Sequence, residues 1–165
     1  MKILSFFFIA FTVVVFGEIN SFSEPNRNPY QEFYLRFYTA GLGSNLGSMQ
    51  PVFVVKGRQF LYTREQNSYM GKRTKQTDTI CSGIMRRSAL DSLIQIVKDE
   101  KDTSVYETNA SIMSGGIHGI SVSIPGDKLE ITLHNAWHAT AQKIVDILNT
   151  HIPADKTKIL IWFRP

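Results

Sequence analysis

The amino-acid sequence predicts an α+β fold, with two amphipathic helices packed on one face of an antiparallel sheet of about five or six strands. Three observations lead to this prediction. Apolar and polar residues alternate in several short stretches, apolar residues recur at helical spacing in two longer stretches, and no regular strand-helix-strand alternation indicates a parallel sheet. The expected order is strand, hairpin, helix, hairpin, helix, strand.

The first strands are predicted between residues 33 and 65. Residues 33–38 alternate apolar and more polar side chains, which is typical of a strand with one wetter face. Residues 51–65 contain two β-rich runs separated by Lys56 and Gly57, a spacing that predicts a tight hairpin with glycine at positive φ. The polar residues that follow predict a loop, or a poorly regular strand around residues 79–81.

Two helices are predicted from apolar residues at helical spacing. Ser88 is the expected N-cap of the first helix, over residues 88–100. Asn135 is the expected N-cap of the second helix, whose apolar stripe comprises Trp137, Ala141, Ile144, Val145 and Leu148.

The remaining strands surround the second helix in the sequence. Residues 120–133 alternate in period two on both sides of Pro125-Gly126-Asp127, so they predict a second hairpin. Residues 158–163 (KILIWF) are apolar on both parities, which predicts a short final strand buried on both faces.

The N-terminus predicts export. Lys2 precedes an apolar run over residues 3–16 that is shorter than a membrane span, and Gly17 provides a small residue before Glu18. We therefore predict a cleaved signal peptide at 1–17, a flexible lead-in at 18–32 and a single α+β domain at 33–165. The protein would be secreted or periplasmic, with no transmembrane segment after cleavage; an uncleaved membrane anchor is the alternative.

Basic residues are concentrated in the middle of the chain. Residues 56–87 contain eight lysines and arginines against two acidic residues, a local charge of +6. A solvated surface explains such a stretch without any partner, but the clustering also suits an acidic protein, a glycan or an envelope surface. An exported protein rarely meets nucleic acid, so nucleic acid is disfavoured. The candidate partner-binding residues are Lys72, Arg73, Arg86 and Arg87.

The glycine-rich stretch 39–51 (TAGLGSNLGSMQP) resembles a phosphate-binding loop only in spacing. Such loops lead directly into a helix whose first N–H groups contact the phosphate, whereas Pro51 and a valine-rich strand follow here. Cys81 is the single cysteine and stands between isoleucines, which favours a buried apolar thiol over a nucleophile. No cofactor is predicted.

The histidines provide the alternative function, a small hydrolase or metal-dependent enzyme that uses His118, His134 or His138. Ser114 and two glycines precede His118, as in a nucleophile with an oxyanion hole, although a half-buried structural histidine is the simpler reading. His134, His138 and Glu130 could together bind zinc or copper. No catalytic motif is present, so we assign no catalytic or metal-binding residue and predict a non-enzymatic binding domain.

Overall fold

The computed structural model describes residues 28–42, 49–66, 77–100, 104–108 and 115–161. Over these residues the chain forms one sheet and three helices, of which only two are longer than a single turn. In sequence order the elements are α1 (Pro29–Glu32), β1 (Tyr34–Leu42), β2 (Met49–Lys56), β3 (Gln59–Gln66), β4 (Thr77–Ile84), α2 (Arg87–Asp99), β5 (Ser104–Thr108), β6 (Gly115–Ile124), β7 (Asp127–His134) and α3 (Ala139–Asn149).

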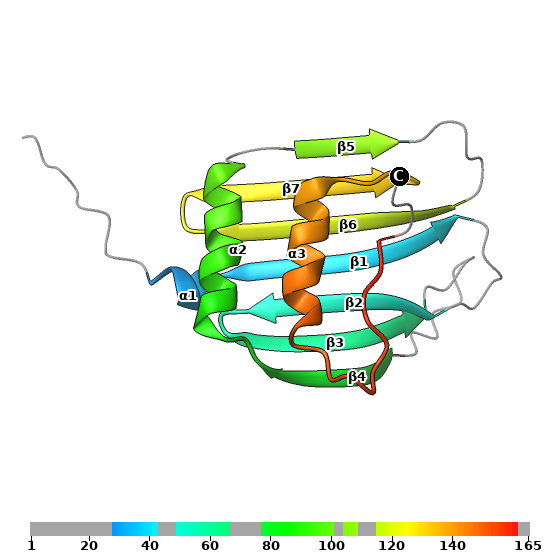
Figure 1. Cartoon of the computed structure of the whole chain (residues 1–165), viewed down its shortest axis with the longest axis horizontal. Coiled ribbons are helices and arrows are strands. Elements are labelled where there is room, and N and C mark those ends of the chain that lie inside the picture. The colour runs from blue at the N-terminus through cyan, green and yellow to red at the C-terminus, as the bar shows by residue number, and fades with distance from the viewer. Residues whose placement is uncertain (1–27, 43–48, 67–76, 101–103, 109–114, 162–165) are drawn as a thin grey trace, which may run out of the picture.

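The sheet has seven strands in the order β4-β3-β2-β1-β6-β7-β5 (Figure 1). Every neighbouring pair is antiparallel except β5 and β7, which are parallel. The predicted α+β class is confirmed, but the prediction of an antiparallel sheet of five or six strands is wrong. The sheet is mixed and larger, because the polar stretch after the first hairpin forms β4 and the segment after α2 forms β5.

The two predicted hairpin turns are confirmed. Gly57, between β2 and β3, has φ +59°, and Gly126, between β6 and β7, has φ +86°. Glycine adopts this left-handed conformation without steric cost, so both turns reverse the chain within two residues.

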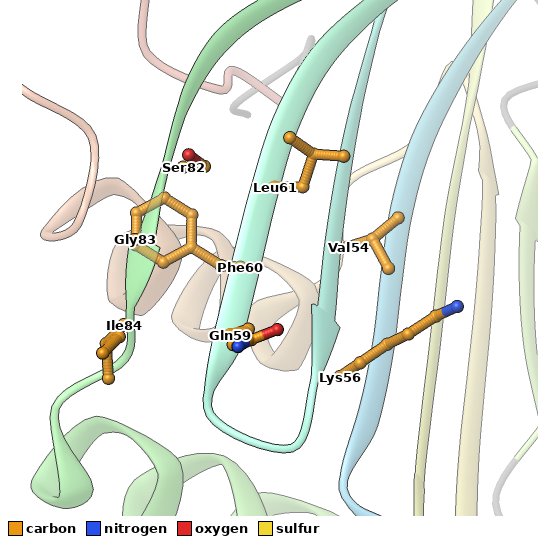
Figure 2. Close-up of a pocket in the computed structure, with 8 residues that line it drawn as sticks. All are labelled: Val54, Lys56, Gln59, Phe60, Leu61, Ser82, Gly83 and Ile84. Carbon is orange, nitrogen blue, oxygen red and sulfur yellow. The ribbon is translucent and has the colours of Figure 1, made fainter.

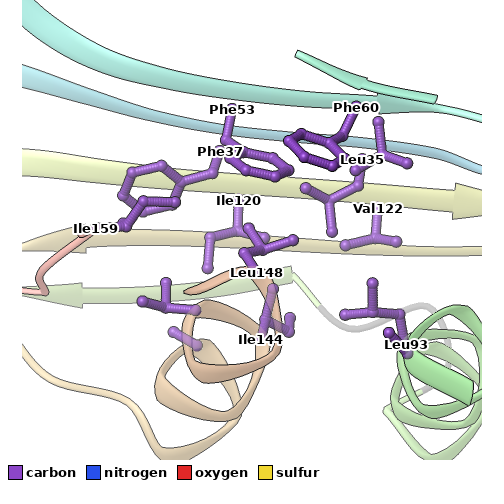
Figure 3. Packing of buried hydrophobic residues seen from close by; sticks show 14 of the residues in the cluster. Leu35, Phe37, Phe53, Phe60, Leu93, Ile120, Val122, Ile144, Leu148 and Ile159 are labelled. Atoms are coloured by element: carbon purple, nitrogen blue, oxygen red, sulfur yellow. The ribbon is translucent and has the colours of Figure 1, made fainter. Parts of the chain in front are cut away.

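Both long helices lie over the same face of the sheet and run across its strands (Figure 1). Each buries one apolar stripe: Ala89, Leu90, Leu93, Ile94 and Val97 on α2, and Ala141, Ile144, Val145 and Leu148 on α3. Figure 3 shows Leu93, Ile144 and Leu148 directed at the strands.

The predicted helix starts differ from the observed ones. Arg86, not Ser88, is the N-cap of α2, and its side chain makes no capping hydrogen bond. The N-cap of α3 is His138, and Asn135, with φ +52°, lies in the connection between β7 and α3. Trp137 therefore precedes the helix and is 38% exposed instead of contributing to the apolar stripe.

The core depends on the register of the central strands. Phe37 of β1 lies opposite both Phe53 of β2 and Ile120 of β6, so that one apolar row crosses three strands on the helix side (Figure 3). A second row is formed by Leu35, Val55 and Val122. All six side chains are buried, and they lie on the face of the sheet that the helices cover.

The predicted last strand at 158–163 is wrong over its described part, residues 158–161, which pair with no strand. Ile159 and Ile161 are nevertheless buried, because the segment crosses the sheet on the helix side and adds to the core there. Asn149, at the end of α3, holds it: its Nδ2 donates to Ile159 O (2.9 Å) and its Oδ1 accepts from Ile159 N (2.8 Å). Lys158 Nζ also donates to Asn149 O (2.9 Å) and to Ile152 O.

We expect Asn149→Ala to reduce the free energy of unfolding by about 1–3 kcal/mol, because two backbone groups of Ile159 lose their partner in a partly buried site. Urea unfolding followed by circular dichroism measures this change. Gln95→Ala is the matched control, since it removes one exposed side-chain hydrogen bond, to Asp99, and should cost less than about 0.5 kcal/mol. Equal losses in the two variants would contradict the role of Asn149.

Candidate functional site

The face of the sheet turned away from α2 and α3 is called the open face here. The side chains on it follow from strand parity, because each residue next to a core position points the other way. Two rows of paired residues cross β1, β2, β3 and β4 on this face. One row is Arg36, Val54, Leu61 and Ser82, and the other is Tyr34, Lys56, Gln59 and Ile84.

A hollow of about 620 Å³ lies where these rows reach β4, and we call it the edge groove (Figure 2). This volume is within the range of small-ligand sites. Leu61 and Ile84 contribute exposed apolar surface, with 43% and 66% of each residue accessible. The groove is lined by Val54, Lys56, Gln59, Phe60, Leu61, Ser82, Gly83 and Ile84.

Gly83, which lines the groove, must be a glycine because the ring of Phe60 lies very close to its Cα. A Cβ at this position would lie 2.9 Å from Cε1 of Phe60, whose ring crosses toward Gly83 from β3 (Figure 2). Phe60 also stacks on Phe53, with ring centroids 5.2 Å apart, so the ring has little freedom to move. Because Gly83 has no side chain, β4 can lie close to the Phe60 ring.

A second hollow of about 410 Å³, the turn pocket, adjoins the β2–β3 turn and shares Lys56 and Gln59 with the edge groove. Its other lining residues are Asn28, Tyr30, Gln31, Gly57, Arg58 and Arg87. Lys56, Arg58 and Arg87 are the cations of this pocket, and none of the described residues that line either hollow is acidic. The two hollows together combine apolar surface with a positively charged end.

Helix α1 forms one wall of the turn pocket and occupies the last four residues of the stretch predicted as a lead-in. The Tyr30 hydroxyl donates to Asp91 Oδ1 of α2 (2.5 Å), and Gly57 N donates to Phe33 O (2.8 Å). These bonds tie α1 to both α2 and the β2–β3 turn, so the wall is fixed relative to the cations.

Two of the four predicted partner-binding residues, Arg86 and Arg87, lie at the start of α2, two and three residues after the end of β4, and both are exposed. Lys72 and Arg73 lie outside the described residues. The Arg86 backbone N–H donates to His151 Nε2 (3.2 Å). Burial lowers the pKa of His151, which favours the neutral ring that can accept this bond.

Four residues of these hollows were not predicted as site residues from the sequence: Lys56, Arg58, Leu61 and Ile84. Lys56 and Arg58 were visible as charges on both sides of a glycine turn, which places them at one end of the sheet. The apolar pair had no signal of its own, because Leu61 and Ile84 become neighbours only through the pairing of β3 with β4.

His118 lies in the core and not in a cleft. It is 1% exposed, its ring stacks near Phe37, with centroids 6.1 Å apart, and its Nδ1 lies 3.2 Å from Thr39 Oγ1. Burial lowers its pKa to about 4. The expected hydrogen-bonded histidine is thus present and more deeply buried than expected; Ser114, its proposed partner, lies outside the described residues.

His134 and His138 are not joined by Glu130 in a metal site. Glu130 contacts Lys128 instead (2.6 Å), and His134 Nδ1 lies 3.5 Å from Thr108 Oγ1. Among the residues that the structure describes, no group of three histidine, cysteine or acidic side chains could hold a metal ion.

Cys81 and the glycine-rich stretch 39–51 are the remaining sequence features. Cys81 is partly buried beside the core, and burial raises the pKa of its thiol, as expected for an apolar contact rather than a nucleophile. Residues 43–48 of the glycine-rich stretch lie outside the described residues.

Within the described ranges, no helix has the length and apolar character to cross a membrane.

Stability should fall as the pH decreases from about 6.5 to 4. The unfolded chain binds a proton on His118 near the ordinary pKa of 6.5, whereas the folded chain binds it only near pH 4. The free energy of unfolding therefore decreases by about 3 kcal/mol over this interval. Urea unfolding at several pH values should show this slope, and His118→Gln should reduce it, leaving the contribution of His151, whose pKa is also lowered by burial. An identical slope in the parent and the variant would contradict this assignment.

Comparison with known proteins adds no assignment to this geometry: neither a protein-family model nor a curated protein matches the chain.

Proposed function

We propose that the chain is an exported, non-enzymatic binding domain that recognises an acidic partner through the basic end of its sheet. The observation that carries this proposal is the gathering of Lys56, Arg58 and Arg87 around one pocket, which no acidic residue lines within the described part of the chain. Arg86 adds a fourth exposed cation beside them. An acidic protein, a glycan or an anionic envelope surface would meet this charge.

The chemistry of these cations fits the proposal. Arginine presents a planar fork of N–H donors that matches carboxylate, sulfate and phosphate groups. Arg58 Nη2 donates to Met85 O (3.3 Å), and α2 fixes the backbone of Arg87. Because these groups are partly ordered before binding, less conformational entropy is lost when a partner arrives.

Export is the second part of the proposal and is supported by the sequence of residues 1–17. A single cysteine provides no disulfide, so the mature domain depends on its core for stability. The buried rows of the sheet and the two helix stripes supply that core.

Reversing two charges should weaken binding to acidic polymers. We expect Lys56→Glu/Arg87→Glu to bind immobilised heparin and polyglutamate about tenfold more weakly at low salt, from about 0.7 kcal/mol for each lost contact. Elution salt and titration calorimetry measure the change. Lys98→Glu/Lys143→Glu, on exposed helix positions, has the same net charge and is the control. If both pairs of substitutions weaken binding equally, net charge alone explains it and the site is wrong.

The full chain expressed in a secreting host should yield a mature protein that begins at Glu18, or a few residues later near Ser21 or Ser23. N-terminal sequencing of the exported fraction identifies the first residue. Recovery of the chain with Met1 in the membrane fraction would instead show the uncleaved anchor.

A further inference from the structure

Strand β4 ends the sheet on the side of the edge groove, and among the described strands it pairs only with β3. It has eight residues, with Asp78 as its single charge and no proline. Natural edge strands are usually protected by being short, by charge, by proline or by bulges. The irregularity opposite Tyr62 and Thr63 interrupts the first half of β4, and Cys81–Ile84 then pair regularly with β3.

The backbone groups that face outward can be identified from one hydrogen bond. Met85 N donates to Arg58 O (2.7 Å), so the amide of Met85 points toward β3. Strand amides alternate in direction, which places the amides of Cys81 and Gly83 on the same inner side. The N–H and C=O groups of Ser82 and Ile84 therefore point away from the sheet, and no other described strand pairs with them.

Ser82 and Ile84 also present their side chains on the open face, at the rim of the edge groove. A strand added beside β4 would place side chains next to both residues on that face. Ser82 is small, so a large apolar side chain opposite it can pass over Ser82 and contact Leu61. Ile84, 66% exposed, offers a second apolar contact.

Positive charge lies beyond the end of this strand. Arg86 and Arg87 follow Ile84 by two and three residues, and both are exposed. The opposite edge of the sheet differs. Strand β5 has five residues, contains Glu107, and lines neither of the two hollows.

We infer that β4 receives an extended segment of a partner protein as an additional antiparallel or parallel strand. The segment carries apolar residues at alternate positions, which cover the edge groove, and one or more acidic residues at the end that meets Arg86 and Arg87. This inference rests on the proposed function, because it specifies the acidic partner as a peptide segment bound through its backbone.

Binding of defined peptides tests the inference. The probe is a fluorescein-labelled peptide, EETVTVTVEE, with acidic residues at both ends so that either strand direction is served. The controls are KKTVTVTVKK and a form of the acidic peptide with N-methylated amides at alternate positions. We expect the acidic peptide to bind at least about tenfold more tightly than either control, measured by fluorescence anisotropy.

Matched substitutions on the two sheet edges test the location. Ile84 and Tyr106 have nearly equal exposure, 66% and 67%, and both lie on the open face. Ile84→Glu should weaken peptide binding about tenfold, whereas Tyr106→Glu should leave it within about twofold. Ser82→Pro should also weaken it, since proline removes an outward N–H without removing a bond to β3.

Hydrogen exchange supplies a readout that does not depend on the variants. Peptide binding should slow exchange of the Ser82 and Ile84 amides, while those of Cys81 and Gly83 are protected in the free protein. Equal binding of the N-methylated peptide, or unchanged exchange at Ser82 and Ile84, would overturn the inference. Oleate that binds and displaces the peptide would instead indicate a single-chain lipid.

The outcomes separate this inference from the proposed function. If heparin binding depends on Lys56 and Arg87 but the acidic peptide does not bind, strand addition is wrong and the acidic-partner surface stands. If the peptide binds but substitution of Lys56 and Arg87 leaves heparin binding unchanged, recognition depends on the edge strand. The basic end of the sheet then does not determine partner binding.

Discussion

The burial of one face of the sheet is the constraint on which the rest of the structure depends. The rows that contain Phe37 and Leu35 cross three strands on the side of α2 and α3, and a shift of register by one residue would turn every one of these side chains to the other face. This requirement fixes the register of β1 against β2 and β6. As a consequence, the alternate residues of these strands, among them Arg36, Lys56 and Leu61, point to the open face.

The C-terminal segment links the core to the candidate site. Asn149 positions the segment around Ile159, which completes the buried layer. His151, two residues after Asn149, accepts a hydrogen bond from the backbone N–H of Arg86. His151 also lies edge-on to Phe60, with ring centroids 6.0 Å apart. The start of α2, and with it the exposed cations, is therefore held by the same segment that closes the core.

The local elements were the most predictable part of the molecule. The apolar stripes of both helices and the glycine turns at Gly57 and Gly126 were visible because they depend on short-range periodicity and on backbone conformation. Strand β5 was not, because an exposed five-residue strand has little apolar alternation. The last segment was misread as a strand because Ile159 and Ile161 are buried without belonging to the sheet. The basic character of the site was also visible, and Arg86 and Arg87 were named from it.

The sequence by itself determined the α+β class, the helix faces, the two turns and a basic middle region, since each follows from neighbours within a few residues. Only the tertiary structure decided that β4 lies at an edge, that Leu61 and Ile84 border one groove, and that Lys56 and Arg58 lie near Arg87. These relations join residues about 20 to 30 positions apart, and strand pairing across the sheet sets them. Side-chain periodicity specifies which face of a strand is buried, but not which strand becomes its neighbour.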